Sequence, residues 1–285
     1  MQRLVLLCSL GVTLLAQSRI AVHGHRGART VLPENTIPAF EYAIAQGVDA
    51  LELDLAVTKD NVLVVSHDPI LNDKICAGPA GTLRVIRQLT LAEVRKWDYG
   101  AKANPEFPRQ KAVPGTKAPT LDEVLALAPK GKFEFNVEIK SDPDKPELQP
   151  EPMEFAKLVA KAVRAKKLQS RVMVQSFDWR TLEAMQKVAP EIRLSALHPK
   201  GMADAILKMD YVSAIHKLKF PMISPHYRLV TKAKVDEAHK LGMKVIPWTA
   251  NDEKVWDDLI EANVDAIITD DPAACIAYLK LKGRR

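Results

Sequence analysis

The segment Ala50-Leu51-Glu52-Leu53-Asp54-Leu55 constrains the fold more than any other part of this 285-residue chain. Apolar and acidic residues alternate along it as they do in a β-strand, so Glu52 and Asp54 project from the same face. Burying two carboxylates is costly unless a cation or hydrogen-bond donors hold them. We therefore expect this strand to bind something positively charged.

Polar side chains recur at the ends of other strand-like segments. Two histidines and a Glu–Lys pair take such positions: His25, His67, Glu138 and Lys140. Three later segments, 171–177, 244–249 and 265–269, also end in polar or aromatic groups. Functional groups at the C-terminal ends of successive strands are typical of a (β/α)8 barrel.

Strand-like and helix-like segments alternate almost throughout the chain, which predicts an α/β fold. Strands are expected at 20–25, 50–57, 62–66, 134–140, 171–177, 192–197, 220–225, 244–249 and 265–269. Helices are expected at 36–47, 121–128, 153–167, 179–189, 201–208, 230–241, 252–261 and 272–281. This count supports a closed eight-stranded TIM barrel, and 285 residues allow one such domain.

A long irregular stretch interrupts the alternation between the second strand region and the next helix. It runs from about residue 68 to residue 118, is rich in proline and glycine, and contains one helix-like segment at 90–97. A loop of this length inside a compact domain needs a reason. We interpret it as an insertion that hangs over the barrel mouth.

The N-terminus has the layout of a secretory signal peptide. Arg3 precedes an apolar run over residues 4–16, which ends in the small-residue sequence Ala16-Gln17-Ser18. The run is short for a transmembrane helix. We expect a signal peptide at 1–18 and a mature domain at 19–285 that is exported (periplasmic or secreted), without stable membrane insertion.

Composition limits the partners of the chain. The apolar share of 47% is ample for a core, and the net charge of +6 is modest and spread along the sequence. We interpret the charges as solvated helix faces, with at most a mild attraction for anionic substrates or membrane surfaces, and we expect no nucleic-acid partner. Without the signal peptide, Cys76 and Cys275 remain, either as a disulfide or as two free thiols.

Three acids at corresponding strand ends indicate a metal site. Glu52, Asp54 and Glu138 are hard oxygen donors without a cysteine partner, which favours Mg²⁺ or Ca²⁺ over zinc. A single acid at such a position would more often form a salt bridge. Beside this site, His25 and His67 are candidates for proton transfer near neutral pH.

Other residues near these strand ends suit a phosphate ester. Arg26 and Lys140 can bind phosphate oxygens, or can pair with the acids. Trp248 offers an apolar wall for a carbon skeleton, or packs at the barrel rim. His23 shares a face with His25 but lies deeper, so we expect it in the core or behind the site. A metal, two histidines and two cations together suit phosphodiester cleavage, in which one histidine activates a nucleophile and the other protonates the leaving oxygen.

The chain also resembles the glycerophosphodiester phosphodiesterase family from about residue 20 to its end. Eight motifs carry the resemblance in the family's order and spacing: His25-Arg26-Gly27, Pro33-Glu34-Asn35-Thr36, Glu52-Leu53-Asp54, His67-Asp68-Pro69, Glu138-Ile139-Lys140, Gln175-Ser176-Phe177, Trp248-Thr249 and Thr269-Asp270. Each motif alone is weak, but eight in register are specific. The stretch 68–118 falls where that family carries its characteristic insertion.

The resemblance implies metal-dependent hydrolysis of small-molecule glycerophosphodiesters to glycerol 3-phosphate and an alcohol. The implied acid–base pair is His25 and His67, without a choice of which is the acid. The implied ligands of a divalent cation, Ca²⁺ or Mg²⁺, are Glu52, Asp54 and Glu138. The implied substrate-binding and supporting residues are Arg26, Lys140, Trp248, Glu34 and Gln175.

Two other functions remain open from the sequence. A lysophospholipase D or a sphingomyelinase D-like phospholipase would share the histidine pair and the acidic site, but the insertion lacks the large apolar residues expected of a lipid-binding mouth. A non-catalytic barrel that binds phosphoesters would be expected to lose a histidine or an acid, and all are present. The head-group alcohol, the choice between Ca²⁺ and Mg²⁺ and the oligomeric state stay open.

Overall fold

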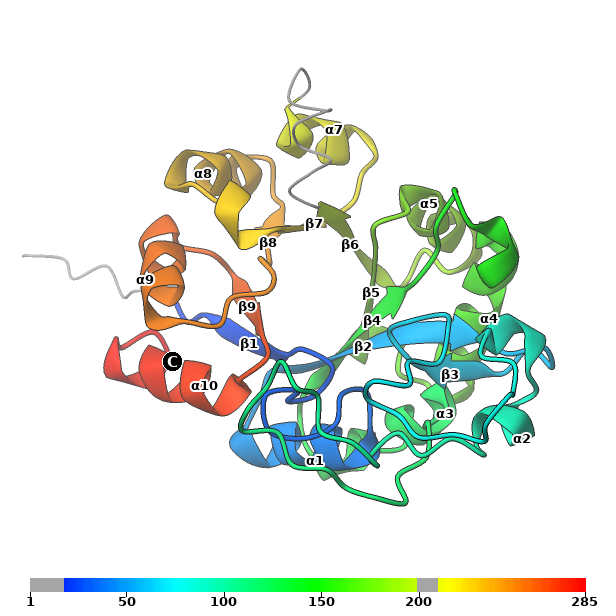
Figure 1. Cartoon of the computed structure of the whole chain (residues 1–285). Helices are drawn as coiled ribbons and strands as arrows, with labels where there is room; N and C mark the ends of the chain where they lie inside the picture. The colour runs from blue at the N-terminus through cyan, green and yellow to red at the C-terminus, as the bar shows by residue number, and fades with distance from the viewer. Residues whose placement is uncertain (1–17, 199–209) are drawn as a thin grey trace, which may run out of the picture.

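A computed structural model describes residues 18–198 and 210–285 of the chain. In these residues, eight parallel strands form a nearly closed barrel with helices outside it (Figure 1). The strands are β1 (Ala21–Gly24), β2 (Ala50–Val57), β4 (Glu134–Ile139), β5 (Val172–Ser176), β6 (Arg193–His198), β7 (Met222–Pro225), β8 (Lys244–Val245) and β9 (Ala266–Thr269). Their order around the barrel is β8-β7-β6-β5-β4-β2-β1-β9, which confirms the predicted TIM barrel.

The barrel is weakest between β8 and β9. The strand expected at 244–249 is only two residues long, because Pro247 lacks the N–H group that would continue the ladder. Backbone hydrogen bonds still join the two segments, from Asp265 N to Val245 O at 3.0 Å and from Ile268 N to Pro247 O at 2.9 Å. The chain therefore closes the ring here with single hydrogen bonds in place of a strand ladder.

Helices cover the outside of the barrel, and all of those named next except α7 lie close to their predicted positions. They are α1 (Ile37–Gln46), α3 (Leu121–Leu125), α4 (Pro152–Ala165), α5 (Trp179–Val188), α7 (Tyr211–Lys217), α8 (Lys232–Lys240), α9 (Glu253–Ala262) and α10 (Pro272–Leu281). The helix expected at 201–208 lies outside the described residues. Helix α7 was not predicted, since its valine and histidine residues are weak helix formers; the Asp210 side chain caps it by accepting from Val212 N.

Local signals set the ends of α1, which holds the loop that follows β1. The Thr36 side chain caps the helix by accepting from Ala39 N, and Gly47 ends it in the left-handed region at φ 82°. The helix expected at 36–47 therefore agrees with the structure to within one residue at each end. Because this helix begins directly after the loop 25–36, its fixed start also fixes the loop that carries part of the site.

Alternation along β2 separates the main core from the interior of the barrel. Leu51, Leu53 and Leu55 are fully buried in the main apolar cluster between strands and helices. Burying each such side chain stabilises the fold by about 1.5–3 kcal/mol. Glu52 and Asp54 take the alternate positions and project into the barrel, so apolar packing on one face holds the acids of the other face in place.

The insertion between β2 and α3 has a small core of its own. It begins with β3 (Leu63–Val65), which pairs antiparallel with β2, and it includes the short helix α2 (Leu91–Val94). Its buried apolar residues include Leu71, Ile86, Leu89, Val94, Trp97 and Tyr99. These residues follow no helical or strand periodicity in the sequence, so the cluster was not predicted. Their packing holds the irregular stretch in a defined conformation.

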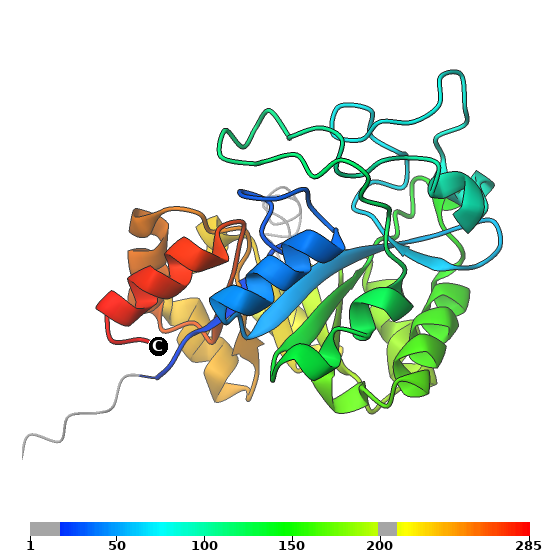
Figure 2. The ribbon, with the colours of Figure 1, turned by 90° about the horizontal axis from the view of Figure 1, so that it is seen from below.

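The insertion lies on one side of the barrel mouth, and the expectation that it hangs over the mouth is wrong in this respect. Its backbone lies beside α1, β2 and β3, and it rises from that edge (Figures 1 and 2). Gln110 Nε2 donates to Arg29 O at 2.6 Å, and Lys111 N donates to Val31 O at 2.9 Å. These bonds tie the insertion to the loop after β1 and leave the centre of the mouth uncovered by it.

Three predictions about the chain as a whole have different outcomes. Cys76 and Cys275 are both buried and free, so the two thiols do not pair. Over residues 18–198 and 210–285, every helix is too short or too polar to cross a membrane. The expected signal peptide lies outside the described residues except for Ser18, so its removal stays a prediction.

Candidate active site

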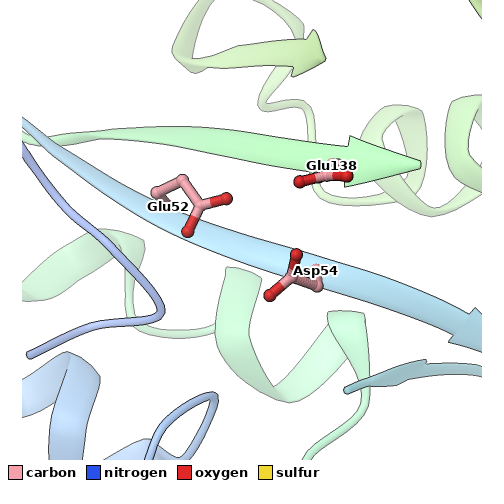
Figure 3. A group of neighbouring side chains, drawn as sticks. All are labelled: Glu52, Asp54 and Glu138. Atoms are coloured by element: carbon pink, nitrogen blue, oxygen red, sulfur yellow. The ribbon is translucent and has the colours of Figure 1, made fainter. Parts of the chain in front are cut away.

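Three carboxylates meet inside the barrel, two from the middle of β2 and one from the C-terminal end of β4 (Figure 3). Asp54 is the register partner of Glu138 across the two strands, and Glu52 lies two residues earlier on the same face of β2. One oxygen from each acid lies within 4.8 Å of the others, and all three side chains are buried. The structure thus brings the predicted metal ligands together.

Burial and mutual repulsion make it unfavourable for all three acids of the cluster to be ionised at once. Burial, together with repulsion from Asp54 and Glu138, raises the pKa of Glu52 well above its usual value. Burial also raises the pKa of Glu138. For Asp54, burial works in the same direction but Arg26 and Lys140 outweigh it, so its pKa lies well below the usual value. Oxygen donors that repel one another in a buried site fit a hard divalent cation such as Mg²⁺ or Ca²⁺.

Arg26 and Lys140 lie against these acids. Arg26 Nη1 donates to Glu34 Oε1 at 2.7 Å, and Arg26 Nε lies 3.3 Å from Asp54 Oδ2. Lys140 Nζ lies 2.9 Å from Glu138 Oε1 and 3.5 Å from Asp54 Oδ1. The structure therefore places both predicted phosphate-binding cations at the acidic cluster, where they pair with carboxylates.

The loop after β1 has an unusual backbone that aims two groups at the acids. Arg26 adopts φ 51°, and its backbone N–H donates to Glu52 Oε2 at 2.8 Å. Gly27 follows at φ 88°, where a Cβ would come within 2.8 Å of Ala39 in α1. A positive φ at a non-glycine residue costs free energy of about 1–3 kcal/mol and persists only where surrounding contacts enforce it. Here the contacts of Arg26 with Glu52 and Glu34 do so.

Asn35 is a site residue that the sequence reasoning did not assign. Its Nδ2 donates to Asp54 Oδ2 at 2.8 Å, and its Oδ1 accepts from Asp54 N at 3.3 Å. The side chain is fully buried and its backbone has φ 58°. The Pro-Glu-Asn-Thr motif was the available signal. Asn35 holds the carboxylate that sits between Arg26 and Lys140.

His25 is fixed by a carboxylate from the last strand. Its Nδ1 lies 2.5 Å from Asp270 Oδ1, and its Nε2 lies 4.0 Å from Glu52 Oε2. Asn251 Nδ2 donates to Asp270 Oδ2 at 2.6 Å. Burial lowers the pKa of His25 below its usual value, and Asp270 opposes this shift only in part. A neutral imidazole that is held in this way can accept a proton.

His67 reaches the same site from the other side. The β2–β3 hairpin brings it there, because Ser66 N donates to Asp54 O at 3.0 Å. His67 Nδ1 lies 2.7 Å from Asp68 Oδ1, and about a third of the His67 side chain is exposed. The hydrogen bond with His67 is the main reason that the pKa of Asp68 is lowered. Each predicted histidine therefore has a carboxylate partner on Nδ1.

A layer of polar side chains lies below Glu52 in the barrel. Gln175 Nε2 donates to Glu52 Oε1 at 2.9 Å, and Asn136 Nδ2 donates to Gln175 Oε1 at 2.9 Å. Asn136 Nδ2 also lies 3.4 Å from His23 Nδ1. Burial lowers the pKa of His23 to about 4, so its ring is neutral and can accept this hydrogen bond. His23 is thus buried behind the site, as predicted, and Gln175 supports Glu52.

A cavity of about 230 Å³, here called the central cavity, opens above these groups. Its lining includes both histidines, both cations and two of the acids, namely His25, His67, Arg26, Lys140, Glu52 and Glu138. Trp248 forms part of its wall and lies edge-to-face with Phe177 at 5.1 Å between ring centroids. Phe177 was not among the predicted site residues, although it follows Gln175 by two positions and so extends the same face.

The carboxylate partner of His25 was not predicted from the sequence. Asp270 and Asn251 belong to the last two βα units, so their position beside β1 depends on barrel closure. The strand-end motif Thr269-Asp270 was the only available signal. Apart from these partners, the predicted residues gather around the central cavity, and Glu34 supports Arg26 from its edge.

The chain is similar to a known protein family and to named relatives over most of its length. Residues 25–274 match the model of the Glycerophosphoryl diester phosphodiesterase family. The chain is 34% identical to a glycerophosphodiester phosphodiesterase of Caldanaerobacter subterraneus over 92% of this chain and 98% of that protein. It is 31% identical to a Bacillus subtilis protein of the same name, over 91% of this chain and 86% of that protein.

Solved structures share the architecture. A crystal structure from Silicibacter pomeroyi, of a protein assigned as a candidate glycerophosphoryl diester phosphodiesterase, superposes with a TM-score of 0.87 at 32% identity, over 93% of this chain and 95% of that chain. A phosphodiesterase of Oleispira antarctica, solved with the product sn-glycerol-3-phosphate, has a TM-score of 0.76 at 21% identity, over 92% of this chain and 97% of that chain. At that identity the second likeness concerns the fold alone.

Proposed function

The chain belongs to the glycerophosphoryl diester phosphodiesterase family, and from this premise we propose a metal-dependent hydrolysis of glycerophosphodiesters to glycerol 3-phosphate and an alcohol. The observation that carries the proposal is the content of the central cavity. Two of the three clustered carboxylates, both cations and both carboxylate-paired histidines line one space of about 230 Å³, and the third acid, Asp54, lies within 4.8 Å of the other two. The relatives named glycerophosphodiester phosphodiesterase, at 34% and 31% identity, support the same substrate class.

Glu52, Asp54 and Glu138 would hold a divalent cation, Mg²⁺ or Ca²⁺. When bound, such an ion neutralises negative charge on phosphate oxygens. Arg26 and Lys140 pair with these acids in the structure. If the acids hold a metal ion and a phosphate binds beside it, both cations can exchange their carboxylate partners for phosphate oxygens. Each cation can then donate hydrogen bonds to phosphate oxygens.

The two histidines divide the proton transfers. His25 is neutral because burial lowers its pKa, and Asp270 on Nδ1 leaves Nε2 facing the site as a proton acceptor. It takes the proton of the attacking oxygen. Attack by water gives glycerol 3-phosphate directly, whereas attack by the glycerol hydroxyl gives a cyclic phosphate that water opens to glycerol 3-phosphate in a second step. His67 with Asp68 donates a proton to the leaving alcohol oxygen as the P–O bond breaks. A positioned acid or base of this kind contributes roughly 10²–10⁴-fold to a rate.

Trp248 supports the glycerol half of the substrate. Its Nε1 donates to Ser224 O at 2.8 Å, so the indole is fixed and presents an apolar surface to the central cavity. Carbon atoms of glycerol can pack on this surface while Arg26 and Lys140 hold the phosphate. We expect broad tolerance on the alcohol side.

An assay of the purified chain tests the function. The protein is treated with EDTA, supplied with Mg²⁺ or Ca²⁺, and offered glycerophosphocholine, glycerophosphoethanolamine and lysophosphatidylcholine. Release of glycerol 3-phosphate only after metal addition supports the proposal, whereas full activity without metal contradicts it. Lysolipids are included because two apolar side chains of the insertion, Ile70 and Leu83, are exposed. A strong preference for the lysolipid would move the function to a lysophospholipase D.

We also propose that the working enzyme is exported. The support is the signal-like composition of residues 1–18. Ser18 contacts the folded domain: Arg284 Nε donates to Ser18 O at 2.8 Å, and Ser18 Oγ donates to Asn263 Oδ1 at 2.8 Å. N-terminal sequencing of the secreted protein tests this, with a start within two residues of Arg19 expected. Active cytoplasmic protein that keeps Met1 would contradict it.

A further inference from the structure

A second cavity adjoins the central cavity and has no role in the proposed reaction so far. It measures about 200 Å³ and lies beside β4, and it is here called the side cavity. The two cavities share four lining residues: His67, Glu138, Lys140 and Phe177. The shared wall is therefore the place where the phosphate-binding cation Lys140 and one of the two histidines lie.

A phosphodiester has two arms that leave the phosphorus atom in different directions. A phosphate held by Lys140 at the shared wall can place one arm in each cavity. We propose that the side cavity binds the alcohol that leaves and that the central cavity binds the glycerol arm. This inference rests on the proposed function and adds to it a binding site for the head group.

The positions of the histidines give this assignment its direction. His25 lines the central cavity, whereas His67 lines both cavities. On the glycerol side, His25 receives the proton of the attacking water or glycerol hydroxyl as its oxygen bonds to phosphorus. On the other side, the bond between phosphorus and the alcohol oxygen breaks, its electron pair stays on that oxygen, and His67 supplies the proton. The leaving alcohol is then released into the side cavity.

The lining of the side cavity combines apolar walls with paired charges. Its apolar walls are formed by Pro69, Ile139, Leu148 and Phe177. The charged groups at its edge are paired, with Lys145 Nζ 3.3 Å from Asp142 Oδ2 and His67 Nδ1 2.7 Å from Asp68 Oδ1. Because the charges offset one another, the cavity suits compact amino alcohols and compact polyols alike. Within each class, the smaller alcohol fits a narrowed cavity better.

Leu148 gives a direct test, because it is half-buried, lines the side cavity and does not line the central cavity. Leu148→Trp should narrow the side cavity. Two substrate pairs separate size from charge: the ethanolamine and choline diesters both carry a cationic alcohol, and the glycerol and inositol diesters both carry an uncharged polyol. In each pair, we expect kcat/KM of the variant to fall by roughly tenfold more for the larger alcohol. Inhibition by glycerol 3-phosphate should be unchanged.

Two further variants serve as controls. Leu241→Trp makes the same change at an exposed position at the end of α8, and it should match the wild type on all four diesters. Leu148→Ala enlarges the side cavity and should favour the larger alcohol of each pair, which tests the proposal even if Leu148→Trp folds poorly.

Three outcomes would overturn the inference. Equal losses for small and large alcohols in Leu148→Trp would show that the alcohol does not occupy the side cavity. A weaker inhibition by glycerol 3-phosphate in the same variant would show that the two arms are reversed. Unchanged head-group selectivity in both Leu148 variants would leave the side cavity without a ligand in this reaction. Failure of the proposed function looks different, since the wild type would then hydrolyse none of the four diesters.

Discussion

His25 Nδ1 lies 2.5 Å from Asp270 Oδ1, which joins the ends of β1 and β9 across 245 positions of the sequence. Asn251 holds the other oxygen of Asp270 at 2.6 Å. A carboxylate on Nδ1 fixes the tautomer of an imidazole and leaves Nε2 free to accept a proton. The function assigned to His25 therefore depends on the parallel pairing of β1 with β9, which are the first and last strands along the chain.

Asp270→Asn should lower kcat by roughly a hundredfold or more, because the fixed orientation and tautomer of His25 are lost. It should also move the acid limb of kcat/KM. Burial already places the pKa of His25 below its usual value, and Asp270 is the group that raises it. Without this carboxylate the pKa falls further, so the acid limb should shift to lower pH. A pH–rate profile of both proteins measures the shift.

A matched control removes a carboxylate from the surface. Asp257→Asn takes away an exposed charge on α9 that pairs with Lys282, and it should leave both the rate and the pH profile unchanged. If the acid limb of Asp270→Asn moved to higher pH, the proton acceptor would be a group other than His25.

Glu52→Gln should stabilise the metal-free protein while it weakens metal binding. Because the pKa of Glu52 is raised in the folded state, its contribution to stability is present at low pH and is lost as pH rises through the raised pKa. The melting temperature of the variant should thus exceed that of the metal-free wild type, and the difference should grow as pH rises. The expected size is about 2–4 °C for each kcal/mol of free energy of unfolding that the variant gains.

Added Mg²⁺ or Ca²⁺ should raise the melting temperature of the wild type more than that of the variant. Thermal melts at several pH values, with EDTA or with metal, measure both effects, and a variant that gained equally from metal would remove Glu52 from the metal site.

The three histidines should differ in what their loss affects. His25→Ala and His67→Ala should each retain metal binding by calorimetry and lose turnover by roughly a hundredfold. His23→Ala should cost far less, because His23 contacts Asn136 and does not line the central cavity. Comparable losses in His23→Ala and His25→Ala, with both proteins folded, would mean that the deeper histidine takes part in the chemistry.

Much of this site could be predicted because it follows from local patterns. The alternation of β2 places Glu52 and Asp54 on one face whatever the rest of the chain does, and its eight-residue extent was predicted at both ends. Asp270 is different, because its role depends on which strand lies next to β1. Nothing near residue 270 carries that information. The strand predicted at 244–249 is present as β8, but its length was overestimated, because the neighbours of Pro247 favour a strand although proline cannot continue the ladder.

Contacts between inward-facing side chains on adjacent strands could not be predicted from the sequence either. Asn136 and Gln175 lie on adjacent strands, and their hydrogen bond depends on the stagger of the sheet. The sequence shows only that both positions face inward. The register of the strands determines which inward side chains meet. The hydrogen bond between Asn136 and Gln175 links His23 to Glu52.

Asn136→Leu tests whether this deeper layer serves the metal site. The change conserves volume but removes the N–H that Gln175 Oε1 accepts. The amide of Gln175 can then turn, and the hydrogen bond from its Nε2 to Glu52 Oε1 is no longer enforced. Residues behind metal ligands typically affect metal affinity by 10–100-fold, so calorimetry should show a loss of roughly tenfold or more. The double variant with Gln175→Met should bind metal no more weakly than Gln175→Met alone, because both changes act through one contact.

The control for this prediction lies in the same barrel interior. Ser195→Ala removes a buried hydroxyl whose hydrogen bond, 2.8 Å long, runs to Ser224 Oγ and involves neither Glu52 nor Gln175. It should perturb packing to a similar degree and leave metal affinity at the level of the wild type. If Asn136→Leu bound metal as tightly as Ser195→Ala, Asn136 would contribute to packing of the barrel interior and not to metal affinity. Additive losses in the double variant would mean that Asn136 acts on Glu52 by a route that does not pass through Gln175.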